Sequence, residues 1–111
     1  MKVFFHSKKL QKACSTEKEM LIQMGAQQAR KLKMRLMELQ AADNLQQLAK
    51  LPPPRCHELS GDRKGQFSVD LDHPYRLIFI PADDALPIKD DGGIDWGRVT
   101  AVEILEIADT H

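Results

Sequence analysis

The sequence has few cysteines, few aromatic residues and no long apolar run, and these shortages exclude several classes of protein. Two cysteines, Cys14 and Cys56, are too few for the disulfide scaffold on which many small secreted domains depend. No apolar run approaches the roughly 20 residues that span a bilayer, and the apolar part of segment 1–9 is too short for the core of a signal peptide. We therefore expect a cytoplasmic protein.

The chain also lacks net charge, because 16 basic residues balance 16 acidic ones, but the two signs are separated along it. Residues 1–50 carry ten Lys or Arg and four acids, whereas residues 77–111 carry two Lys or Arg and eight acids. A basic region can attract a polyanion such as nucleic acid, or it can simply be the solvated face of a helix. A length of 111 residues predicts one domain over 1–111.

Helix start signals dominate the first half of the chain. Residues 2–6 predict a short strand, and Ser7 is placed to cap a brief helix after it. Thr16 followed by Glu19 is a capping box, which predicts a second helix start. Gly25 is expected to break the helix that begins there.

The clearest predicted helix covers residues 26–42. Its apolar residues recur at helical spacing and share one face: Ala29, Leu32, Leu36 and Leu39. Its basic residues lie mostly off that face: Arg30, Lys31, Lys33 and Arg35. Four methionines are expected to fill gaps in the core: Met20, Met24, Met34 and Met37. Asp43 is expected to cap a further short helix at 44–50, before the prolines that begin at Pro52.

The second half of the chain has the period of strands. Strands are predicted at 55–59, 66–71, 75–80 and 98–107, with a polar turn at 60–65 and a loop at 81–97. The 75–80 run is apolar almost throughout, which is typical of a central strand. This order predicts an α+β fold, with helices packed on one face of a mostly antiparallel sheet.

Two segments of the second half carry a family resemblance. Residues 57–69 read His-Glu-Leu-Ser-Gly-Asp-Arg-Lys-Gly-Gln-Phe-Ser-Val, and residues 74–79 read Pro-Tyr-Arg-Leu-Ile-Phe. They resemble the HigB, or killer-protein, branch of the RelE/ParE toxin superfamily, whose members carry His-x-Leu-Lys-Gly-Asp-Arg-x-Gly and then an aromatic-Arg-hydrophobic strand. These toxins also end in Asp-Tyr-His, and this chain ends in Asp109-Thr110-His111. The resemblance covers the whole length and implies a RelE-like fold.

The resemblance implies the toxin of a type II toxin–antitoxin system, which cleaves messenger RNA on the translating ribosome without a metal or cofactor. Its implied partners are the ribosome, the messenger RNA and a HigA-like helix-turn-helix antitoxin. Two departures predict weakened cleavage, because Ser60 stands where the family often has Lys and Thr110 where it usually has Tyr. A gyrase-poisoning toxin like the ParE branch, and a degenerate member that only binds its antitoxin, are the alternatives.

RNA cleavage through the 2′-hydroxyl requires a base for the 2′ proton, an acid for the 5′-oxygen and cations for the phosphate. Imidazole suits both proton transfers because it gains and loses a proton near neutral pH. His57 and His111 are the candidates, and the sequence leaves open which is the base and which the acid. The resemblance implies that Asp109 orients or stabilises one imidazole and that Arg76 holds phosphate, since guanidinium matches two phosphate oxygens.

The further RNA-binding candidates are four cations: Arg63, Lys64, Lys31 and Lys33. Each residue also has an ordinary interpretation. A strand-end histidine is usually a surface residue, a terminal Asp-x-His is often a frayed tail, and Arg63 could simply pair with Asp62. Arg76 is the more informative residue, because a charge in an apolar strand must point to a polar face or be paired.

Metal and thiol chemistry have little support in the sequence. The four histidines and two cysteines lack ligand spacings such as Cys-x-x-Cys. Cys56 and His57 are adjacent on a predicted strand, so their side chains point to opposite faces and do not form a nucleophile–base pair.

Overall fold

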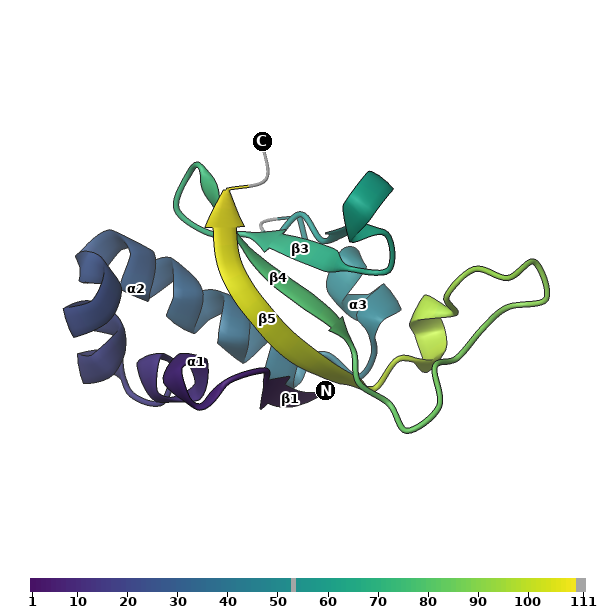
Figure 1. The fold of residues 1–111 in the computed structure, drawn as a ribbon, viewed down its shortest axis with the longest axis horizontal. Helices are drawn as coiled ribbons and strands as arrows, with labels where there is room; N and C mark the ends of the chain where they lie inside the picture. The colour runs from purple at the N-terminus through teal and green to yellow at the C-terminus, as the bar shows by residue number, and fades with distance from the viewer. Residues whose placement is uncertain (53, 110–111) are drawn as a thin grey trace.

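The computed structural model describes residues 1–52 and 54–109, and it contains three α-helices, five strands and two short 3₁₀ turns in that part of the chain. The order of the main elements is β1 (Lys2–Phe5), α1 (Lys8–Ala13), α2 (Glu17–Ala41), α3 (Leu45–Ala49), β2 (His57–Glu58), β3 (Phe67–Asp70), β4 (Tyr75–Pro81) and β5 (Ala101–Asp109) (Figure 1). The predicted α+β class is confirmed.

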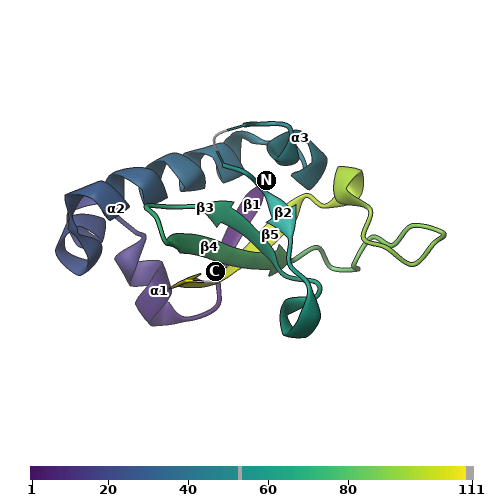
Figure 2. The same ribbon diagram turned by 90° about the horizontal axis from the view of Figure 1, so that it is seen from above.

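The strands form one sheet in the order β1-β5-β4-β3-β2. β1 runs parallel to β5, and the other three pairings are antiparallel, so the sheet is mostly antiparallel as predicted. The apolar strand β4 is central, also as predicted. α2 and α3 lie along one side of the sheet, and α1 lies near β1 and α2 (Figure 2).

The predicted helix starts are present. The Ser7 hydroxyl accepts a hydrogen bond from the Leu10 amide at 3.1 Å, and the Thr16 hydroxyl accepts one from the Glu19 amide at 3.1 Å. Gly25 interrupts α2 with φ +80°, a left-handed conformation that glycine adopts without steric cost. The expected cap at position 43 is wrong: Asn44 caps α3, and its side-chain oxygen accepts from the Gln47 amide at 2.8 Å.

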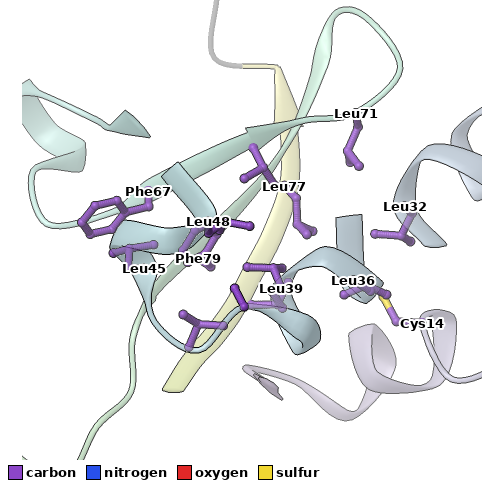
Figure 3. Packing of buried hydrophobic residues seen from close by; sticks show 14 of the residues in the cluster. Cys14, Leu32, Leu36, Leu39, Leu45, Leu48, Phe67, Leu71, Leu77 and Phe79 are labelled. Carbon is purple, nitrogen blue, oxygen red and sulfur yellow. The ribbon is translucent and has the colours of Figure 1, made fainter. Parts of the chain in front are cut away.

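The core lies between α2, α3 and the sheet. The four apolar residues predicted to share one face of α2 are all buried and belong to one core cluster with residues of α3, β3, β4 and β5. Figure 3 shows Leu32, Leu36 and Leu39 of this face together with labelled residues of α3, β3 and β4. The methionine prediction is only half right. Met20 is buried and Met24 is half-buried, but Met34 and Met37 are 46% and 57% exposed, because they fall on the outer side of α2.

Two strands begin two or more residues later than the sequence predicted. The strand expected over 55–59 contains only His57–Glu58, since Arg55 has φ +50° and leaves extended geometry. The last strand begins at Ala101 rather than at Arg98, because residues Trp96–Arg98 form a 3₁₀ turn. Both differences lie at strand ends, where local turn geometry overrides the apolar pattern.

Candidate functional site on the open face of the sheet

The face of the sheet that points away from α2 and α3, here called the open face, carries the candidate site. Strand register places four residues in one row across this face: His57, Ser68, Ile78 and Glu106. A second row contains Asp70, Arg76 and Ala108. Because side chains alternate along a strand, the intervening residues, such as Leu77 and Phe79, point to the helices instead.

A bulge in β5 determines which of its residues reach the open face. Phe79 pairs with Ile104 whereas Ile78 pairs with Glu106, so Leu105 is the extra residue. A bulge of this kind re-aims the side chains that follow it. Without it, Glu106 would share a face with Ile104, which is buried in the core.

A close polar contact on the open face joins His57 to Arg76. His57 Nε2 lies 3.2 Å from Arg76 Nη1, and His57 Nδ1 lies 3.2 Å from the backbone oxygen of Arg55. A guanidinium only donates and a carbonyl only accepts, so both contacts require a neutral imidazole with its proton on Nδ1. This is the form in which Nε2 can take a proton from a hydroxyl.

Asp70 lies between two arginines. Its Oδ1 is 3.5 Å from Arg76 Nε, and its Oδ2 is 3.5 Å from Arg55 Nη1. The Arg76 side chain is 13% exposed, so it is largely desolvated. Burial of a guanidinium requires charged and polar partners, which Asp70 and His57 supply here.

Arg63 lies in the polar turn before β3. Its Nη1 donates to Gln66 Oε1 at 3.0 Å, and its Nη2 lies 3.4 Å from Glu106 Oε1. The turn needs its flanking Gly65, which has φ +87°. Lys64 ends the 3₁₀ turn and is exposed.

The cluster therefore holds three arginines and two carboxylates around one neutral imidazole. Its residues are Arg55, Arg63, Arg76, Asp70 and Glu106. The arginines outnumber the carboxylates by one, so the cluster keeps a positive charge that favours an anion. An arriving phosphate would compete with the carboxylates for guanidinium groups of suitable geometry.

Ser68 adds a buried hydroxyl to the same row. It is fully buried, and within residues 1–52 and 54–109 its Oγ has no hydrogen-bond partner. A buried hydroxyl without a partner costs free energy and calls for an explanation. Ser68 pairs with His57 in the strand register, so this unsatisfied hydroxyl lies beside the candidate site.

The remaining predicted site residues do not all join the cluster. Lys31 and Lys33 are exposed on α2, which covers the other side of the sheet, and Lys33 forms an ion pair with Glu17 of the same helix. Asp109 is exposed at the end of β5, paired with Tyr75 next to the Arg76 row. Thr110 and His111 lie outside the described residues.

Sequence reasoning missed the two carboxylates and placed one arginine wrongly. Polar and apolar residues alternate along 66–71, and this alternation could have indicated Asp70, because Asp70 shares a face of the strand with Ser68. Nothing in the local pattern indicated Glu106, which depends on the bulge. Arg35 was expected off the apolar face of its helix, but it is 3% exposed. It is buried because Glu38 and the Asp70 backbone supply acceptors.

Neither cysteine is suited to nucleophilic chemistry. Burial raises the pKa of the Cys14 thiol to about 11 and that of Cys56 to about 12, so both are thiols at neutral pH. Among the described residues, no three His, Cys, Asp or Glu side chains are grouped to hold a metal ion. Within the same part of the chain, no helix is long and apolar enough to span a membrane.

Comparison with known proteins adds no assignment: no protein-family model matches this sequence, and no curated protein matches it.

Proposed function

We propose that the chain is a RelE-like toxin of the HigB branch, a ribosome-dependent messenger RNA endonuclease of the cytoplasm. The observation that carries this proposal is the contact of His57 Nε2 with Arg76 Nη1, on an open face that also holds Arg63. A proton acceptor beside guanidinium groups is the combination that cleavage through a 2′-hydroxyl needs.

In the proposed reaction the 2′-oxygen attacks the adjacent phosphorus. The O2′–P bond forms as the P–O5′ bond breaks, which leaves a 2′,3′-cyclic phosphate and a 5′-hydroxyl. His57 Nε2 takes the 2′ proton, since its neutral form already carries a proton on Nδ1. Arg76 moves from the imidazole to a phosphate oxygen and stabilises the charge that develops on the pentavalent phosphorus.

The proton for the 5′-oxygen is assigned to His111, with Asp109 as its orienting carboxylate. Asp109 ends β5 opposite Tyr75, directly beside the row that contains Arg76 and Ala108. His111 follows Asp109 by two residues in the sequence and lies outside the described residues, so its role as the acid rests on the family resemblance. Arg63 and Lys64 would bind neighbouring phosphates.

Primer-extension mapping of messenger RNA after induced expression tests the proposal directly. We expect cuts confined to translated regions, with none when His57→Ala is expressed at the same level. Lys89→Ala is a suitable control, because this residue lies in the 81–97 loop and pairs only with Asp91 among its described neighbours. Uncut messenger RNA together with trapped gyrase–DNA complexes would instead support the ParE-like alternative.

The proposed antitoxin is tested by affinity purification from cells that carry the native operon. A toxin of this kind is expected to form a stable complex with a small protein encoded next to it. We expect that protein to co-purify in a stoichiometric amount. Absence of any small partner would contradict both the endonuclease toxin and the degenerate antitoxin-binding alternative.

A further inference from the structure

A charged side chain in the helical layer of this fold is buried. Arg35 of α2 is 3% exposed, although the other basic residues of its segment are exposed. Removing a guanidinium from water is costly unless its donors are satisfied. Arg35 Nη1 donates to Glu38 Oε1 at 2.7 Å, and Arg35 Nε donates to the backbone oxygen of Asp70 at 2.6 Å. The second bond links the helical layer to the end of β3.

Asp70 connects four parts of the molecule. Its amide donates to the Pro54 oxygen at 2.8 Å, and its carbonyl accepts from Arg35. Its carboxylate contacts Arg55 on one oxygen and Arg76 on the other. The residue therefore ties α2, β4 and the segment that leads into His57 to one point on β3.

We infer that Asp70 is the positioning residue of the open-face site and that buried Arg35 supports it from α2. The carboxylate forms an ion pair, not a hydrogen bond, with the Nε side of the Arg76 guanidinium at 3.5 Å, while Nη1 is directed at His57 Nε2. Through Arg55, the same carboxylate steadies the carbonyl that accepts from His57 Nδ1. Asp70 thereby sets both the plane of Arg76 and the tautomer of His57.

The contacts of Asp70 with Arg76, Arg55 and Arg35 are features of the structure. Only the effect of Asp70 on RNA cleavage rests on the proposed function. Asp70 affects cleavage through geometry, because a guanidinium that is held at two points loses rotational freedom. A correctly placed group reacts faster than one that must first be ordered. Asp70 acts through Arg76 and His57 and is not assigned a contact with substrate.

The test uses the full chain and the variant Asp70→Asn, with Asp84→Asn as the control for loss of one negative charge. Asp84 is exposed on the 81–97 loop. Long-range ¹H–¹⁵N NMR reports the His57 tautomer without any need for activity. We expect wild type and Asp84→Asn to hold the Nδ1-protonated form, and Asp70→Asn to show a mixture of both tautomers.

Cleavage on programmed ribosomes provides the second measurement. We expect Asp70→Asn to lower kcat/KM by about 10–100-fold, as for a misplaced catalytic group, and Asp70→Glu to restore part of the loss. An unchanged His57 tautomer in folded Asp70→Asn would overturn the inference. A wild-type protein that cleaves no RNA would overturn the proposed function instead, and the NMR result would still decide the role of Asp70.

The contribution of Arg35 is tested by a double substitution, Arg35→Met with Glu38→Gln, so that no unpaired charge remains buried. Arg30→Met is the matched control, since Arg30 is exposed on the same helix. We expect the double variant to fold and to show the same tautomer mixture as Asp70→Asn. A folded double variant with the wild-type tautomer would remove Arg35 from the inference and leave Asp70 in it.

Discussion

The two faces of the sheet are built from the same strands but differ in composition. On the face under α2 and α3, the strand residues are apolar and fully buried, as Phe67, Leu77 and Phe79 illustrate. On the open face, the alternate positions carry His57, Asp70, Arg76 and Glu106; Asp70 and His57 contact Arg76, and Glu106 pairs with Arg63 of the turn before β3. Strand alternation thus separates the residues that stabilise the domain from those that can act on a ligand.

Although they differ in composition, the two faces are connected by a hydrogen bond from the helical layer. Arg35 is the exception to the apolar helical layer, and its bond to the Asp70 backbone runs from that layer to the open face. On the open face, Ser68 and Ile78 are both fully buried in the row of His57, and Ile78 is the apolar one of the two. Substitutions on each face should therefore affect mainly one property, stability or activity, with Arg35 affecting both.

The largest expected effect is on the open face. If the proposed function holds, His57→Ala should slow single-turnover RNA cleavage by about 10²–10⁴-fold, because it removes the proposed proton-transfer group. Arg76→Ala should also slow cleavage, because it removes charge stabilisation in the transition state. His57 is exposed, so His57→Ala should lower the free energy of unfolding only by about 1 kcal/mol, the loss of its contact with Arg76. Wild-type cleavage rates in both variants would contradict the catalytic roles proposed for His57 and Arg76.

The helix-covered face should show the opposite behaviour. Phe79→Ala should lower the free energy of unfolding by about 3–5 kcal/mol, because it leaves a cavity in the core and removes the stacking with Phe67. Phe4→Ala is the matched control, since Phe4 is 50% exposed and should cost far less. Urea unfolding measures both. Similar losses in the free energy of unfolding for Phe79→Ala and Phe4→Ala would contradict the burial of Phe79 in the core.

The outer side of α2 provides a third comparison. Reversing Lys31 and Lys33 together to Glu should weaken ribosome binding by about tenfold at low salt, because it removes cations that release counterions from RNA. The fold should persist, since the exposed pair of Lys33 with Glu17 contributes little. Co-sedimentation at several salt concentrations measures the effect, with Lys50→Glu/Lys89→Glu as control. Equal binding by both double variants would exclude this surface from RNA contact.

The smallest expected effect lies in the loop between β4 and β5. Burial raises the pKa of Asp83, but hydrogen bonds from the Thr100 hydroxyl and from the Thr100 and Ala101 amides outweigh it and lower the pKa overall. A lowered folded pKa means that this stabilisation is present above the unfolded pKa and is lost as pH falls through the folded value.

Asp83→Asn should accordingly lower the free energy of unfolding by about 1 kcal/mol at pH 7. The difference from wild type should shrink below about pH 4. Chemical unfolding across this pH range measures it, and Asp84→Asn is the control. A difference that stays constant with pH would show that the ionised carboxylate of Asp83 does not stabilise the fold.

Local sequence determined most of the elements of this protein. The hydroxyls of Ser7 and Thr16 begin two helices, Gly25 interrupts the second, and the spacing of Leu32 and Leu36 marks its buried face. These features depend on residues within a few positions of one another. For this reason the helix starts, the helical face and the α+β class were predictable.

The tertiary structure alone decided how the candidate site is completed. Glu106 reaches the open face because β5 has a bulge, and the bulge depends on pairing with β4. Arg35 is buried because Asp70, 35 residues away, offers a backbone acceptor. Both ring nitrogens of His57 have a partner because Arg76 and the Arg55 carbonyl contact the imidazole from either side. Each of these outcomes requires groups brought together by strand register and helix packing, which periodicity in the sequence does not encode.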